Sequence, residues 1–217
     1  MSTETLVRTV GPVTRRRVGY VAIALAFTAV AALPGGLLWP EPSGSGETYT
    51  YAAIQPHRAL WWGLLVALGA NLVINVPAQA LLTVLLVRAR GAAWATVGGI
   101  IMWIGTALYA VGVGGWATAY YFATAPGVDP SVIERINDDM GHVLGALIPG
   151  SMLVAIGTVL QAVGLLRSRA VPRWIPVLWL VIVATFIVPG NGVAGLITAV
   201  PMTAAALGTA YYAWKKV

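Results

Sequence analysis

Long stretches without any charged residue dominate this sequence. Residues 59–87 and 92–123 each lack Asp, Glu, Lys and Arg and exceed the roughly 20 apolar residues that cross a bilayer. Only 9% of the 217 residues are charged, against about 25% in soluble domains. Residues 1–217 are therefore predicted to form one all-α domain, a polytopic helix bundle in the cell membrane. Its six predicted transmembrane helices are 18–38, 59–87, 92–123, 141–166, 174–188 and 192–214.

The charges predict the orientation of this bundle. Six spans put eleven basic residues on one side: Arg8, Arg15, Arg16, Arg17, Arg88, Arg90, Arg167, Arg169, Arg173, Lys215 and Lys216. The other side holds Arg58 and Arg135 with six of the seven acids. Cytoplasmic loops are enriched in Lys and Arg, so both termini are predicted to be cytoplasmic. Because this asymmetry accounts for the net charge of +6, we expect no nucleic-acid partner.

A cluster of acids precedes the fourth apolar segment. Ser131 and Glu134 fit a capping box, and Pro130 suits a helix start. The sequence therefore predicts a helix that begins near Ser131 and continues into 141–166.

The turn signal "PGNG" at 189–192 ends the short fifth segment.

Asp138, Asp139 and His142 are the candidate catalytic residues. Residues three or four apart on a helix share a face, so both carboxylates are expected to approach His142, which lies just inside the apolar segment. Clustered carboxylates raise one another's pKa, and a carboxyl group that stays protonated can act as a general acid. The alternative is that this is simply a hydrated helix end, where the helix dipole also favours acidic residues.

A metal site is a further alternative at this position. His57, the only other histidine, ends the preceding outer loop and could join His142 and the two aspartates as a ligand. The spacing matches no metal motif, so we predict no metal and no other cofactor. Whether the two histidines share a site stays open.

Helix 59–87 carries a polar stripe. Asn71, Asn75 and Gln79 recur every four residues, and buried amides in a bilayer need a partner or a cavity. We predict that Asn71 and Asn75 bind substrate. The alternative is that they form hydrogen bonds between helices.

Three aromatic residues of helix 92–123 are candidates for the wall of an apolar pocket. Most Trp and Tyr residues fall at predicted membrane interfaces, where aromatic residues are enriched. Trp103 and Tyr109 fall inside the helix, and Trp116 lies toward its outer end. Aromatic faces can stabilise a cation, so we predict that these three bind substrate. Core packing is the alternative.

The chain resembles small six-span membrane proteins of high-GC bacteria in its layout, its inward loop "LLRSRAVPRW" and the histidine after "DDMG". It is also loosely similar to bacterial membrane-bound terpene cyclases in combining acids, aromatics and an apolar bundle. That resemblance implies protonation of an alkene or epoxide by a carboxylic acid. The chain departs from those enzymes in having no acid in the middle of a span, so no catalytic residue is carried over.

These observations lead to one main hypothesis, a membrane enzyme that cyclises or isomerises a terpenoid or prenylated precursor. Its expected partners are the bilayer and a hydrophobic small molecule. A non-enzymatic accessory, immunity or structural subunit that packs on a protein partner, or a small transporter, are the alternatives. The chain has no P-loop, which excludes ATP-driven transport by this chain alone.

Overall fold

The fold is helical throughout the residues that the computed structural model describes, which are 12–38, 48–185 and 193–217. No strand occurs in these ranges, so the predicted all-α class is confirmed for them. The six longest helices are α1 (Pro12–Leu38), α3 (Arg58–Leu86), α4 (Ala92–Ala123), α7 (Leu147–Ser168), α8 (Trp174–Thr185) and α9 (Val193–Lys215). The short elements are α2 (Tyr51–Ile54), a 3-10 turn (Gln55–His57), α5 (Ser131–Asp138) and α6 (Met140–Val143).

Five helical segments of the described residues are long and apolar enough to cross a membrane. They are Val13–Gly35, Tyr51–Leu86, Ala92–Ala123, Leu147–Ser168 and Leu196–Lys215. The fifth predicted span, 174–188, is described only as far as Thr185, where α8 has 12 residues. The rest of that span and the "PGNG" turn lie outside the described residues.

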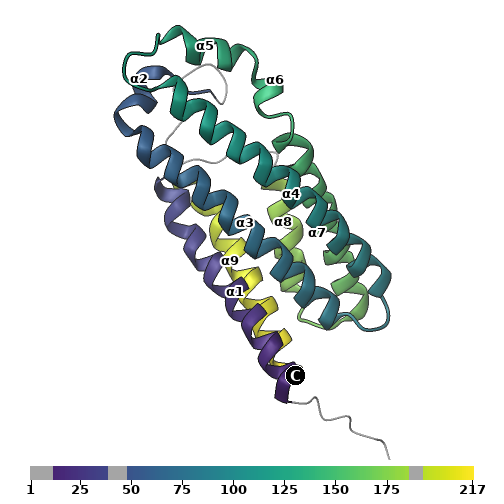
Figure 1. Cartoon of the computed structure of the whole chain (residues 1–217). Coiled ribbons are helices and arrows are strands. Elements are labelled where there is room, and N and C mark those ends of the chain that lie inside the picture. Colours follow the sequence, from purple (N-terminus) through teal and green to yellow (C-terminus); the bar gives the residue numbers. More distant parts are fainter. Residues whose placement is uncertain (1–11, 39–47, 186–192) are drawn as a thin grey trace, which may run out of the picture.

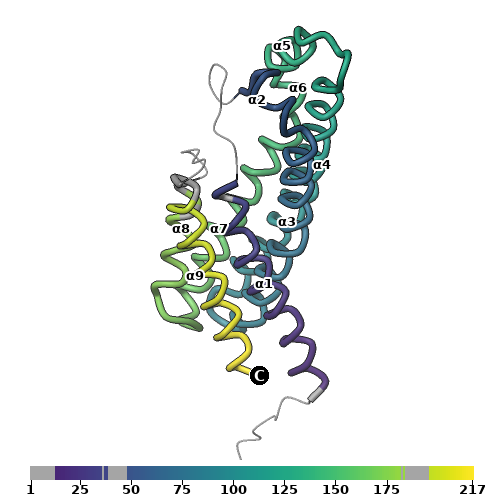
Figure 2. Tube along the Cα trace, turned by 90° about the vertical axis from the view of Figure 1, so that its left-hand side faces the viewer, coloured from purple at the N-terminus to yellow at the C-terminus, as the bar shows by residue number. Residues whose placement is uncertain are grey.

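The long helices form a closed bundle in chain order. Each of α3, α4, α7, α8 and α9 packs against the long helix before it, and α9 also packs on α1. Figures 1 and 2 show α2, α5 and α6 together at one end, which we call the cap. The start of α1, the α3–α4 and α7–α8 turns and the end of α9 lie away from the cap (Figure 1). We call this second end the basic end.

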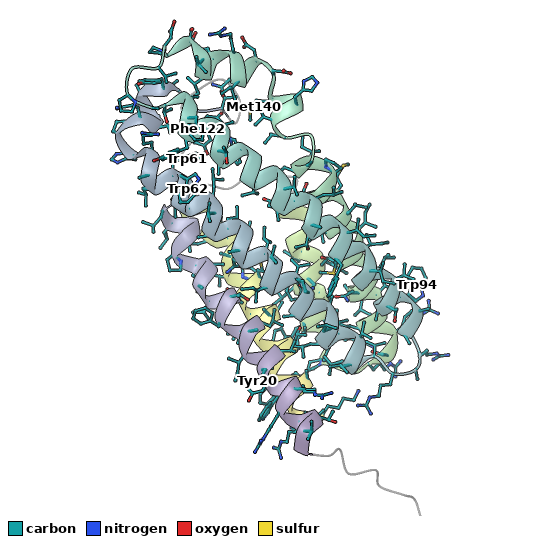
Figure 3. All side chains as sticks on the ribbon, viewed as in Figure 1. Tyr20, Trp61, Trp62, Trp94, Phe122 and Met140 are labelled. Atoms are coloured by element: carbon teal, nitrogen blue, oxygen red, sulfur yellow. The ribbon has the colours of Figure 1, made fainter. Side chains whose placement is uncertain are left out.

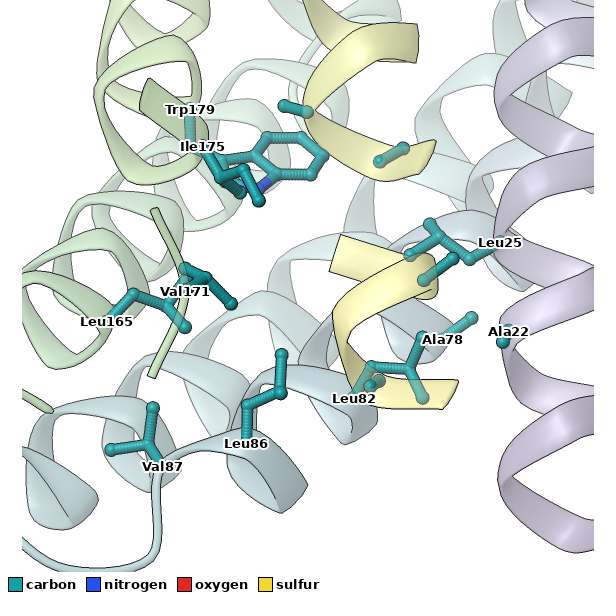
Figure 4. Close-up of a cluster of buried hydrophobic side chains, with 14 of the residues drawn as sticks. Ala22, Leu25, Ala78, Leu82, Leu86, Val87, Leu165, Val171, Ile175 and Trp179 are labelled. Atoms are coloured by element: carbon teal, nitrogen blue, oxygen red, sulfur yellow. The ribbon is translucent and has the colours of Figure 1, made fainter. Parts of the chain in front are cut away.

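The main buried cluster joins all six long helices toward the basic end. Leu25 of α1, Leu82 of α3, Ile175 of α8 and Ala206 of α9 are fully buried in it. Figure 4 shows the larger of these side chains pointing toward one another from separate helices. Outside the core, large apolar side chains are exposed all round the bundle, as lipid contact requires. Trp61, Trp62 and Phe122 lie near the cap, whereas Tyr20 and Trp94 lie toward the basic end (Figure 3).

Glycines set the packing of α4 against α7. On α4 and its N-cap they recur at 91, 98, 105 and 112, and on α7 at 150, 157 and 164. A Cβ added at Gly98 would lie 2.6 Å from the carbonyl oxygen of Gly157, and one added at Gly105 would lie 2.8 Å from that of Gly150. Seven residues are nearly two helical turns, so the same faces meet along the whole antiparallel pair.

The predicted start of the fourth span is wrong. The helix does not run from Ser131 into 141–166, because α5 ends at Asp138, α6 is a single turn, and α7 begins only at Leu147. One face of α5 is apolar, and its Ile133 is buried beneath the cap. A straight continuation of α7 would carry that face into water. Nor does the predicted capping box form, since Asp129 Oδ1 accepts the N–H of Ser131 at 2.9 Å.

Candidate functional site

The histidine and the second aspartate of the predicted catalytic group do form a pair. His142 Nδ1 lies 2.5 Å from Asp139 Oδ1, across the break between α5 and α6. His142 is 90% exposed and Asp139 is 65% exposed, and Asp138 is exposed as well. The predicted contact is therefore confirmed for Asp139. His142 lies on α6, outside the five helical segments of the described residues that are apolar enough to cross a membrane, so the prediction that it lies just inside an apolar span is wrong. The pair is exposed on the cap.

The contact between Asp139 and His142 leads to a testable prediction about the pKa of the histidine. The hydrogen bond that the protonated ring donates to Asp139, followed by the negative charge of that carboxylate, raises the pKa of His142 above the ordinary value. Asp139→Asn is expected to return the pKa of His142 toward that value, as followed by NMR of the ring protons. A raised pKa means that the pair contributes stability at low pH, which is lost as pH rises through that pKa. Asp138→Asn is the matched control, and an equal shift in both variants would contradict the pairing.

Asn71 and Asn75 make hydrogen bonds that tie α3 to α1. Asn71 Nδ2 donates to the carbonyl oxygen of Thr28 at 2.7 Å, and Asn75 Nδ2 donates to Thr28 Oγ1 at 2.9 Å. The Thr28 hydroxyl donates in turn to the carbonyl oxygen of Ala24 at 2.7 Å. Asn75 and Thr28 are buried. These contacts match the packing alternative for the polar stripe, and Thr28 is the partner that sequence reasoning missed.

The three aromatic candidates of α4 lie at different heights. Trp116 belongs to a cluster with Tyr49, Trp61 and Tyr120, which we call the aromatic cluster. The ring centroid of Trp116 lies 5.4 Å from that of Trp61 and 5.9 Å from that of Tyr120. Tyr109 packs at the edge of this cluster. Trp103 lies apart from both, and its side chain is 54% exposed on the outer surface of the bundle. The predicted substrate-binding residues therefore do not meet in one pocket.

Trp103 lines a groove between α3 and α4 with a volume of about 410 Å³. Small residues hollow it out, since Ala80 of α3 and Gly99 of α4 both line it and are buried. Larger apolar side chains flank them, and the polar groups of the lining side chains are the Thr96 hydroxyl and the indole N–H of Trp103. The lining includes Ala80, Val84, Thr96, Gly99, Ile100 and Trp103.

Gln161 of α7 closes the groove from behind. A Cβ added at Gly99 would lie 3.2 Å from Gln161 Nε2. That nitrogen donates to the carbonyl oxygens of Ala80 and Ala95 at 3.3 Å each, and Gln161 Oε1 is buried without a partner. The amide thus fixes the two walls against α7. Sequence reasoning missed the groove, although a glycine four residues before an isolated tryptophan on α4 is a signal for it.

The described residues offer little to a metal ion. No group of three His, Cys, Asp or Glu side chains gathers within them, and His57 is exposed in the 3-10 turn before α3. What remains as a candidate site is an apolar groove on the outer surface of the bundle. Comparison of the chain with protein-family models, with curated proteins and with solved structures gave no match.

Proposed function

We propose that this protein binds the hydrocarbon chain of a bilayer lipid or prenyl compound in the α3–α4 groove. The groove itself carries the proposal. Both of its walls belong to helices that are long and apolar enough to span a membrane, so the groove opens toward molecules dissolved in the bilayer. The groove is lined mainly by carbon atoms, with one indole ring and one hydroxyl group. This lining suits a hydrocarbon chain that carries no polar groups.

We propose in addition that the protein crosses the cell membrane six times, with both termini cytoplasmic. Ten cations and no acid of the described residues lie at the basic end, whereas Asp129, Glu134, Asp138 and Asp139 all lie at the cap end. Cytoplasmic loops attract Lys and Arg. This orientation puts the groove in the inner leaflet, because its residues are close to the α3–α4 turn.

The groove favours binding over acid-initiated cyclisation of a terpenoid. Cyclisation needs the acid and the aromatic wall to face the same apolar space. Asn137, two residues before Asp139, bonds to Tyr120 of α4, and Ile104, which also lines the groove, lies 16 residues before Tyr120. At 1.5 Å per residue the rise along α4 between these two levels is about 24 Å. A substrate chain in the groove is therefore out of reach of that carboxyl group, and we assign no chemical step to the groove.

Trp103→Ala tests the proposal. The variant removes one wall of the groove without touching the helix contacts, and we expect tightly retained lipid to fall about tenfold, which corresponds to about 1.4 kcal/mol. Native mass spectrometry of detergent-purified protein measures the retained lipid. Photoactivatable analogues with either a fatty acyl or a prenyl chain should crosslink to the peptides that contain residues 80–84 and 96–104, and their relative yields identify the chain type.

Trp94→Ala is the matched control, because Trp94 is 44% exposed on the same helix but does not line the groove. It should retain lipid as the unmodified protein does. Equal loss in the two variants, or crosslinks spread evenly over all lipid-facing helices, would mean that lipid contacts the bundle without a defined site. Asp139→Asn should leave retention unchanged; reduced retention would point to the cap instead.

A further inference from the structure

A small crevice at the basic end brings two positive charges together. It has a volume of about 30 Å³ and lies where the first turns of α1 meet the last turns of α3 and α9. A buried water needs about 10–15 Å³, so one or two oxygen atoms fit. Its lining includes Thr14, Val18, Leu86, Arg88, Ala213 and Lys216.

Lys216 is held in place at this crevice by the end of α3. Its Nζ donates to the carbonyl oxygen of Leu86 at 2.7 Å, one of the carbonyl groups that a helix C-terminus leaves without an intrahelical partner. Partial burial of the ammonium group against α3, followed by the charge of Arg88, lowers the pKa of Lys216. An ammonium group has three donors, so Lys216 has two left after this bond.

The two cations face no opposing side-chain carboxylate in the described part of the chain, and the α-carboxylate of Val217, which also lines the crevice, forms no ion pair with either of them. All four described acids lie at the cap end, and the only ion pair among the described residues is that of Asp139 with His142. Like charges that are held close together repel each other unless an anion lies between them. Thr14 of α1 also lines the crevice, and its hydroxyl group is a neutral donor.

The position of the crevice indicates which anion it meets. Val18 and Ala213 are buried in the main core cluster, whereas Arg88 and Lys216 are exposed, so the crevice marks the level where the apolar helices end. Trp214, an interface residue by type, lies next to it, with the Arg15 guanidinium 5.5 Å from the ring centroid. Lipid headgroups occupy this level, and basic pockets between membrane helices bind anionic ones.

We propose that this crevice binds the phosphate group of an anionic phospholipid, with Arg88 and Lys216 as the charged donors and Thr14 as the neutral donor. The site lies across α3 from the groove and does not depend on it. A phosphodiester oxygen fits between the two cations, and the lipid chains then run along the exposed surface of α1 and α3 toward the cap.

Arg88→Gln tests this site against Arg90→Gln. Both residues are exposed in the same turn, and each substitution removes one charge, but only Arg88 lines the crevice. Purified protein is incubated with phosphatidylglycerol or with phosphatidylcholine that has the same acyl chains, and native mass spectrometry measures the retained lipid. We expect Arg88→Gln to reduce retention of phosphatidylglycerol about tenfold, the effect of one lost charge-assisted contact, and Arg90→Gln to change it less than about twofold.

Further results support or overturn the proposal that the crevice binds an anionic phospholipid. Lys216→Gln should act in the same direction as Arg88→Gln, and Trp103→Ala should leave the preference for phosphatidylglycerol intact, which separates this site from the groove. Equal loss in Arg88→Gln and Arg90→Gln would overturn the proposal, since bulk charge alone would then explain binding. Millimolar inorganic phosphate that displaces phosphatidylglycerol completely would assign the crevice to a soluble phosphate and overturn the lipid as its occupant.

Discussion

Gly105→Leu is expected to push α4 away from α7 and to destabilise the bundle strongly. A Cβ at this position would lie 2.7 Å from the backbone nitrogen of Val154 and 2.8 Å from the carbonyl oxygen of Gly150. Backbone atoms cannot turn aside as a side chain can, so the helices must move apart along their whole contact. The cost should reach about 3 kcal/mol or more. Unfolding in increasing denaturing detergent, followed by circular dichroism, measures the loss.

Gly114→Leu is the matched control on the same helix. Gly114 is exposed, and a Cβ added there would meet no atom within 4 Å. Leucine also favours a helix over glycine by about 1 kcal/mol, so this variant should fold at least as well as the unmodified protein. Gly105→Ala should fall between the two. If Gly105→Leu and Gly114→Leu unfold at the same detergent fraction, glycine packing does not hold the pair together.

The limits of α3 and α4 could be predicted from the sequence, because solvation decides where these two apolar helices end. The predicted span 92–123 coincides with α4, and the predicted 59–87 differs from α3 by one residue at each end. Basic residues follow the end of α3 and precede the start of α4, in the turn where the chain must leave the bilayer. The glycine register could not be predicted in this way, because one helix sequence does not name its partner. The seven-residue spacing shared by two segments becomes meaningful only when they are known to pack.

The sequence could predict that Asp139 and His142 touch, but it could not predict which other parts of the chain surround the candidate residues. Spacing predicted that Asp139 and His142 would meet, and they do. Their exposure depends on where α7 begins, which tertiary burial of the apolar face of α5 decides. Asn75 was predicted to be a buried polar residue needing a partner, but Thr28 is 47 residues away in sequence. Trp103 stood out within its helix, whereas the groove beside it depends on Ala80 of a different helix.

Asn137→Ala is expected to release α5 from the rest of the cap. The side chain of Asn137 joins three parts of the chain: its Oδ1 accepts from the Tyr120 hydroxyl at 2.5 Å, and its Nδ2 donates to the Tyr49 carbonyl oxygen at 3.0 Å. Alanine leaves a buried hydroxyl and a carbonyl without these partners, at a cost of about 1–3 kcal/mol for each buried group. Hydrogen exchange of residues 128–143 measures the release, which should appear as faster exchange there while α4 and α7 stay protected.

Asp138→Ala separates this bond from a general effect on the short helix. Asp138 is the next residue on α5 and is exposed, so alanine there removes a charge without a buried contact. Exchange in this control should match that of the unmodified protein. Equal acceleration in both variants would show that α5 is held by helix propensity and by Ile133 alone. Selective release in Asn137→Ala would show that this amide is needed, in addition to the buried Ile133, to hold α5 on α4 and on the segment before α2.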